Sequence, residues 1–195
     1  MFPAKTFPCF RFVLIGLIAT FVVKKQKEME VNVQESELRE AAAQGADAFL
    51  SCIHDRIYET AGGEVCAENL PLLNGEQTTL LAYFILRREV MDGGFVQLIH
   101  NGYGPFIFLN PFAKALRLWG AHDMSKLIYK GRKLFEQYGD QLQTDCTDEE
   151  FMALFEQYPE FDDLDDAFIE MEEETTDCIA HYVDEHIELF VTPQS

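Results

Sequence analysis

The last third of the chain combines a one-sided charge with the periodicity of a helix, and this combination constrains the fold more than any other feature. Residues 134–195 contain 20 Asp and Glu and no Lys or Arg. Within them, Leu164, Phe168 and Met171 recur at intervals of four and three residues, the spacing that places side chains on one face of a helix. The intervening acids therefore project from a helix that also supplies core residues, and the region is predicted to fold.

The net charge of the chain is −19, and almost all of the excess lies in that same region. Residues 1–133 contain 14 acids and 15 bases, a net charge of +1, while residues 134–195 contribute −20. Such a surface repels nucleic acid, whose binding depends on Lys and Arg that neutralise phosphates. It attracts basic proteins or cations instead and steers their approach. A solvated face that serves only solubility is the alternative interpretation.

The line density of this charge makes imitation of DNA phosphates physically possible. A single helix of these 62 residues would span about 93 Å and carry one carboxylate per about 4.6 Å. Two adjacent helices would shorten this interval to about 2.3 Å, against about 1.7 Å for duplex DNA. Like charges one turn apart destabilise a helix by a few tenths of a kcal/mol per pair, so the array has a cost that a function would justify.

Helices are predicted for most of the chain. Apolar residues make up 48% and aromatic residues 13%, enough for a folded core. Apolar spacing, capping-box patterns and glycine or proline stops predict helices over residues 35–60, 74–91, 95–100, 111–119, 124–138, 151–158 and 164–190. Because no segment alternates as a strand does, we expect an all-α fold, a single compact bundle-like domain of roughly seven helices over residues 29–195.

The first 28 residues are set apart from this domain. Residues 12–23 are uncharged and mostly apolar, with Arg11 before them and three lysines after them. This run is shorter than the roughly 20 residues that a membrane-spanning helix needs, and no A-x-A-like cleavage site follows it. It is interpreted as a mis-assigned start, with translation beginning at Met29, or as a possible membrane anchor. Because the segment holds five bases and one acid, the remainder has a net charge of −23.

The sequence offers no support for catalysis, a metal or a cofactor. Five cysteines without a C-x-x-C pair are interpreted as reduced thiols of a cytoplasmic protein. Cys178 and His181 form a lone C-x-x-H, and the acidic block lacks the glycine of an EF-hand loop. The G-x-S-x-G, Walker and dinucleotide-binding patterns are also missing. We therefore expect a binding protein that is not an enzyme and that holds no metal or cofactor.

A glycine-rich corner is unusual for a helical protein. Its residues are Asp92, Gly93, Gly94, Phe95, Gln97 and Asn101. The favoured interpretation is structural: the glycines supply positive φ angles, the phenylalanine fills the core, and the amide side chains satisfy exposed backbone groups. The alternative is a small polar pocket, and with it an enzyme of unknown chemistry.

This corner, followed by a helix that ends in Trp119-Gly120-Ala121, resembles the bacterial DNA-mimic protein family. The acidic block over 161–168 and the tail over 182–186 fit the same pattern, so the resemblance covers about residues 70–190. It implies an all-helical acidic homodimer that occupies the DNA-binding surface of a basic protein, such as a helix-turn-helix transcription factor, and inhibits its DNA binding. The phosphate-mimicking residues that it implies are Asp162, Asp163, Asp165, Asp166, Glu170, Glu172, Glu173 and Glu174.

A different class of binding protein fits the sequence as well. An immunity-type or scaffold protein would recognise a partner without imitating nucleic acid, and the apolar segment from Phe106 to Leu109 could contribute to its interface. Neutralising the acidic block would leave the binding of such a partner intact. The two hypotheses therefore differ in whether the carboxylates or the apolar segment carry recognition.

Overall fold

Helices form nearly all of the regular structure, which confirms the all-α fold expected from the periodicity. The computed structural model describes residues 29–63 and 69–195, so the predictions on residues 1–28, Cys9 and Cys66 lie outside the described residues. The eight α-helices of this part are α1 (Glu35–Gln44), α2 (Ala46–Thr60), α3 (Gly75–His100), α4 (Gly104–Phe108), α5 (Phe112–Leu118), α6 (His122–Leu142), α7 (Asp148–Gln157) and α8 (Asp162–Glu185). Short 3₁₀ turns occur at Leu70–Leu72, Pro159–Phe161 and Ile187–Leu189.

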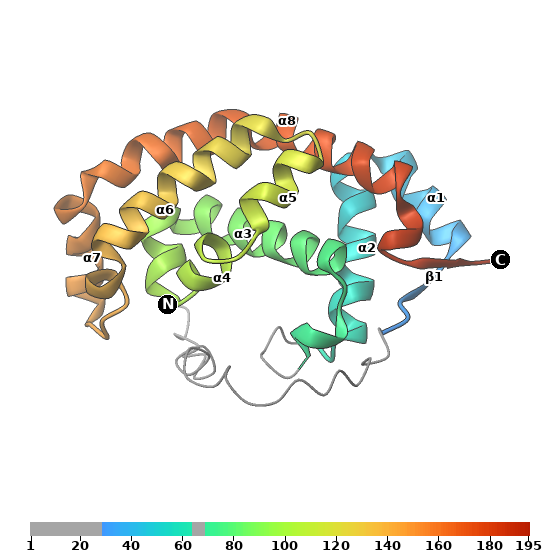
Figure 1. The fold of residues 1–195 in the computed structure, drawn as a ribbon, viewed down its shortest axis with the longest axis horizontal. Helices are drawn as coiled ribbons and strands as arrows, with labels where there is room; N and C mark the ends of the chain where they lie inside the picture. The colour runs from blue at the N-terminus through green and yellow to red at the C-terminus, as the bar shows by residue number, and fades with distance from the viewer. Residues whose placement is uncertain (1–28, 64–68) are drawn as a thin grey trace.

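Helix α8 lies along one side of the molecule and packs on the other helices through one face. Helix α6 runs beside it, α3 passes beneath it, and α2 meets its C-terminal half (Figure 1). The inward face includes Leu164, Phe168, Ile179 and Val183, of which none is more than 6% exposed. Burial of a large apolar side chain contributes about 1.5–3 kcal/mol, so this stripe holds α8 firmly on the core.

Helix α3 is the central helix that the apolar run predicts. At its start, the Gln77 N–H donates to Asn74 Oδ1 at 2.8 Å and the Asn74 N–H donates to Gln77 Oε1 at 3.1 Å, which confirms the predicted capping box. Leu80 in its first half is fully buried. Gly93 and Gly94 have non-helical angles, so α3 is two helical pieces joined by a kink, as the glycine stop predicts.

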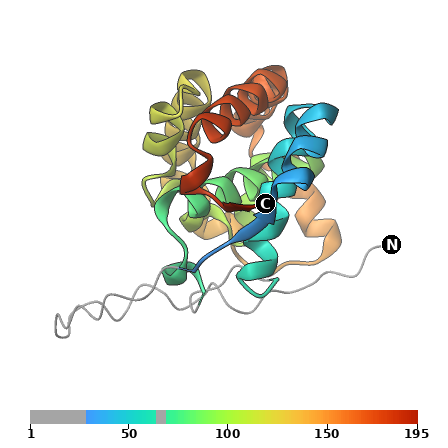
Figure 2. The same cartoon turned by 90° about the vertical axis from the view of Figure 1, so that its right-hand side faces the viewer.

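Two three-residue strands join the ends of the described domain. Strand β1 (Asn32–Gln34) pairs in parallel with β2 (Thr192–Gln194). Figure 2 shows the C-terminus beside β1 at this end of the molecule. Val33 of β1 is 2% exposed, so the pair also closes one end of the core. The sequence does not reveal these strands because three residues are too few for a recognisable alternation.

Two helix boundaries differ from the prediction because of glycines. The expected helix over residues 35–60 is divided into α1 and α2 at Gly45, whose φ of 120° lies outside the helical region. Helix α6, in contrast, continues through Gly139, which was predicted to end it. A Cβ atom on Gly139 would lie 2.8 Å from ring carbons of Phe135, so this glycine makes room for the aromatic ring.

Candidate functional site

Nine exposed carboxylates share one side of helix α8. They are Asp162, Asp163, Asp166, Glu170, Glu173, Glu174, Asp177, Asp184 and Glu185. At about 100° per residue, their positions fall within an arc of about 140° around the helix axis. The buried stripe occupies the opposite side, so core packing holds all nine toward solvent. We call these nine residues the acidic arc.

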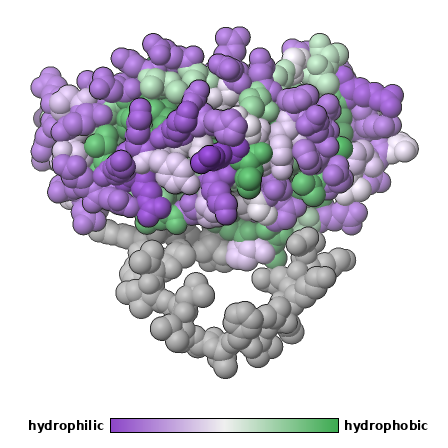
Figure 3. Space-filling model, turned by 45° about the horizontal axis from the view of Figure 1, so that its top comes forward, coloured by the Kyte–Doolittle hydropathy of each residue, from purple (hydrophilic) through white to green (hydrophobic). Residues whose placement is uncertain are grey.

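The acidic arc is not neutralised from within the described part of the molecule. None of its members forms an ion pair with a Lys or Arg of residues 29–63 or 69–195. Glu185 lies 3.4 Å from Nε2 of the exposed His181 one turn away. Figure 3 shows polar side chains over most of this face, with small and separate apolar patches. The negative charges are therefore available to an outside partner.

The other exposed charges near α8 lie on different helices. Helix α7 carries the exposed acids Asp148, Glu149, Glu150 and Glu156. It lies at one end of α8 and does not run alongside it (Figure 1), so the doubled charge density of two adjacent helices is not realised. The neighbouring helices α5 and α6 carry the exposed bases Lys114, Arg117, Lys126, Lys130, Arg132 and Lys133. Two of these bases, Lys126 and Arg132, form ion pairs with Asp123 and Glu136 of α6 itself.

Two of the eight residues predicted to mimic phosphates face the protein instead of solvent. Asp165 accepts a hydrogen bond from the Phe95 N–H at 2.8 Å. Glu172 forms an ion pair with Arg87 through Oε1 and Nε, which are 2.5 Å apart, and its side chain is 14% exposed. These internal contacts correct the prediction for Asp165 and Glu172. The other six predicted residues belong to the acidic arc.

The contact of Asp165 makes protein stability depend on pH. The pKa of this carboxyl is raised to about 6, mainly because burial penalises its charged form. The hydrogen bond from Phe95 opposes this rise, and the nearby charges of Asp162 and Asp166 add to it. Since the folded-state pKa lies above the unfolded value of about 3.9, the folded protein holds the extra proton between about pH 4 and 6. The stability that this proton contributes is present below that window and lost as pH rises through it.

Replacing Asp165→Asn is expected to remove this part of the pH dependence. The amide oxygen still accepts the Phe95 N–H, while the partly buried charge is gone. Because solvent screens a partly exposed group, the expected gain at pH 7 over wild type is about 1 kcal/mol, with no gain at pH 4. Urea unfolding of both proteins at the two pH values measures the difference. Equal gains at both pH values would contradict the assignment.

Arg87 connects three helices and is expected to matter for stability. It forms ion pairs with Asp47 of α2 and Glu172 of α8. Replacing Arg87→Met leaves Glu172 largely buried without its counterion, which we expect to lower the free energy of unfolding by about 2 kcal/mol. The control is Arg39→Met, whose partner Glu35 is an exposed neighbour one turn away, with an expected effect below about 0.5 kcal/mol. Chemical denaturation measures both, and similar losses would contradict the prediction.

The polar side chains of the glycine corner pair with one another, and Gln97 and Asn101 donate to carboxylates instead of to the backbone groups that were predicted as their partners. Glu89, which is 6% exposed, accepts hydrogen bonds from Arg88 and, at 2.7 Å, from the Asn101 side chain. The Gln97 amide donates to Asp92 at 2.9 Å. Within the described residues, every buried side-chain nitrogen or oxygen has a hydrogen-bond partner. The corner therefore fixes the kink of α3 against α8, and its polar groups are occupied by one another.

The apolar segment proposed as an alternative interface is part of the core. Phe106, Ile107 and Phe108 are at most 8% exposed, and Phe108 stacks on Phe135 with ring centroids 5.3 Å apart. Leu109 alone of this segment is substantially exposed, at 49%. The suggestion that this segment forms an interface is therefore wrong for three of its four residues.

Other kinds of site find no support in the described residues. Across 29–63 and 69–195, no three or more His, Cys, Asp or Glu side chains converge in a way that could hold a metal ion. In the same ranges, no helix has the combined length and apolar character that a membrane span requires.

Three members of the acidic arc were not named from the sequence. Asp177, Asp184 and Glu185 extend the arc into the second half of α8. The signal was present: Glu170, Glu173 and Asp177 follow each other at three and four residues, and Asp184 continues that row. These three residues lie outside the densest acidic block, so only the period of the whole helix reveals them.

The fold and this surface define an acidic all-α protein whose chemistry lies in the charge of one long helix. Residues 71–186 match the family described as DMP19-like protein, and the chain belongs to that family. One relative is DNA mimic protein DMP19 of Neisseria meningitidis serogroup B, which is 37% identical over 124 residues. The match covers 63% of this chain and 75% of the relative. The family resemblance of the glycine corner and the acidic block is thereby confirmed.

Proposed function

We propose that the acidic arc imitates the phosphate backbone of DNA. In this proposal, the protein binds the DNA-binding surface of a basic protein, such as a helix-turn-helix transcription factor, and inhibits its binding to DNA. The name of the relative from Neisseria meningitidis supports DNA mimicry for this chain. The observation that carries the proposal is the geometry of the charges on α8.

The spacing of the acidic arc is close to that of one DNA strand. The 24 residues of α8 span about 36 Å, and nine charges over that length give one per about 4 Å. A single strand of B-DNA carries one phosphate per about 3.4 Å, and one helical turn is about 34–36 Å long. A protein surface that contacts the phosphates of one turn would therefore meet a similar number of negative groups along α8.

The core side of α8 supports imitation as much as the exposed side does. Phe168 is fully buried and makes an edge-to-face contact with Phe95, with ring centroids 6.3 Å apart. Tyr83 donates or accepts a 2.6 Å hydrogen bond with Thr176, and Glu172 is paired with Arg87. These contacts fix the helix before a partner arrives, so binding does not have to order it. A fixed array presents its charges at constant spacing, as a duplex does.

Affinity capture at two salt concentrations tests the proposal. Immobilised protein is exposed to lysate at about 50 mM and about 500 mM salt, with Debye lengths of roughly 14 and 4 Å. We expect the immobilised protein to capture basic DNA-binding proteins at low salt and not at high salt. Duplex DNA added at low salt should release them. Capture of proteins that duplex DNA does not release would contradict imitation of DNA.

Two further expectations remain predictions. The family resemblance implies a homodimer, which native mass spectrometry of the full chain would detect as a doubled mass.

The cysteine pattern predicts a cytoplasmic protein. Cys52 and Cys178 are free, half-buried thiols, and burial raises the pKa of both. Fractionation of cells followed by immunoblotting would test the location.

A further inference from the structure

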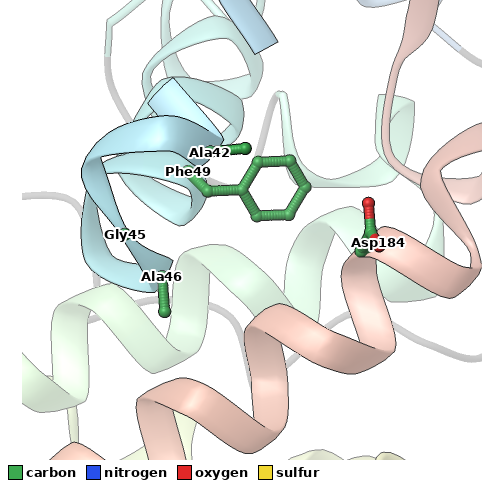
Figure 4. Close-up of a pocket in the computed structure, with 5 residues that line it drawn as sticks. All are labelled: Ala42, Gly45, Ala46, Phe49 and Asp184. Carbon is green, nitrogen blue, oxygen red and sulfur yellow. The ribbon is translucent and has the colours of Figure 1, made fainter. Parts of the chain in front are cut away.

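A small notch lies where α1 and α2 meet the C-terminal half of α8. It has a volume of about 170 Å³ and is lined by Ala42, Gly45, Ala46, Phe49 and Asp184. Figure 4 shows the Phe49 ring and the Asp184 carboxylate directed into the same space from opposite walls. The notch therefore has an apolar wall and one anionic group, and the anionic group belongs to the acidic arc.

The notch exists because the junction of α1 and α2 is built from small residues. Gly45 ends one helix and begins the next with a φ of 120°, and a Cβ atom placed on it would meet nothing within 4 Å. Ala42 and Ala46 on either side add single methyl groups. The Phe49 ring, which is 7% exposed, forms the apolar wall. Larger helix-forming residues at these positions would fill the space.

The chemistry of the notch favours a basic side chain with an aliphatic stem. An anion would be repelled by Asp184, and a purely apolar group would remove water from that carboxylate without replacing it. Asp184 forms no ion pair with a Lys or Arg in the part of the chain that the structure describes. An arginine side chain can contact both the apolar wall and the carboxylate. Its aliphatic stem covers apolar surface, while its planar guanidinium pairs with a carboxylate and stacks on aromatic rings.

We propose that this notch accepts a single arginine side chain of the partner protein. The stem lies against Ala46 and Phe49, and the guanidinium donates to the Asp184 carboxylate. This inference rests on the proposed function, since it names one residue by which a basic partner is recognised. The contact adds shape complementarity to a surface that otherwise acts through charge alone. It would fix the position of the partner along α8.

A titration of the full chain with acetyl-arginine-amide tests the notch directly. In ¹H–¹⁵N NMR spectra we expect saturable shifts at the amides of Gly45, Ala46 and Asp184, with a dissociation constant on the order of 10 mM. Ala46→Leu, which fills the notch, and Asp184→Asn, which removes the charge, should each weaken binding roughly 10-fold. Acetyl-citrulline-amide, which has a similar shape and no charge, should give no saturable shift. Unchanged shifts outside the notch would show that each variant is folded.

Two outcomes would overturn the inference. One is a set of shifts spread along the whole acidic arc that rises linearly with concentration. The other is a folded Ala46→Leu protein that binds acetyl-arginine-amide as wild type does. The titration can succeed when the proposed function fails. If acetyl-arginine-amide saturates the notch but duplex DNA does not release the captured partner, the arginine site is supported and imitation of DNA is rejected.

Discussion

Neutralising four members of the acidic arc is expected to weaken binding of the basic partner roughly 100-fold. The variant carries Asp166→Asn, Glu170→Gln, Glu173→Gln and Glu174→Gln. If each lost contact contributes about 0.7 kcal/mol, as an exposed ion pair can, the four together contribute about 2.8 kcal/mol, or two factors of ten. Affinity should also become less dependent on salt, because fewer counterions are exchanged. Titration of the captured partner at several salt concentrations measures both effects.

A matched control separates the position of these charges from their number. The control variant carries Glu35→Gln, Glu40→Gln, Asp55→Asn and Glu59→Gln on α1 and α2, so it loses the same four charges from exposed positions elsewhere. We expect its affinity to stay within about threefold of wild type. Equal losses in the two variants would show that net charge alone attracts the partner. The arc variant should fold because removing like charges relieves repulsion within a helix. The control variant should fold because the ion pairs that it loses, such as Arg39–Glu35 and Arg56–Glu59, are exposed and contribute little to stability.

Replacing Gly94→Ala is expected to lower the free energy of unfolding by about 3 kcal/mol. Gly94 has φ 69° and ψ −174°, a combination that is essentially restricted to glycine. A methyl group on it would also lie 2.7 Å from the carboxyl carbon of Asp165, so the hydrogen bond from Phe95 to Asp165 would be displaced. The substitution thus strains the kink of α3 and separates it from α8. Urea denaturation followed by circular dichroism measures the loss.

Gly102→Ala is the control for this effect. Gly102 has a φ of 84°, but a Cβ atom on it would meet nothing within 4 Å. It therefore has the backbone cost of a positive φ without the collision, and the expected loss is about 1 kcal/mol. Losses of the same size at both positions would contradict the role that we assign to the contact between the corner and α8.

Local signals in the sequence predicted the helices well. Both capping boxes are present: the Thr147 N–H donates to Glu150 Oε2 at 2.8 Å, as the spacing of these residues predicts, and the box at Asn74 is formed as well. Such patterns depend on residues three positions apart, so a single sequence suffices to find them. The division at Gly45 was missed because one glycine in a run of helix-forming residues is often tolerated within a helix.

The two misplaced carboxylates show where sequence reasoning stopped short. Asp165 lies three residues before Phe168 and Glu172 lies four residues after it. Both therefore lie on the buried side of the helix and not on its exposed side. That spacing could have separated them from the other six acids. Their partners could not have been predicted, because Phe95 and Arg87 lie 70 and 85 positions earlier in the chain and only the fold brings them near. Local periodicity orients a side chain, while tertiary packing selects its contacts.

Competition for one partner tests the central claim most directly. A captured DNA-binding protein is first bound to a fluorescently labelled duplex that it recognises, and the full chain is then added while the sedimentation of the labelled duplex is followed. If the carboxylates of α8 occupy the surface that phosphates would occupy, the duplex returns to the rate of free DNA, and the four-charge variant of the arc fails to release it. A faster species that contains duplex, partner and this protein together would contradict the account.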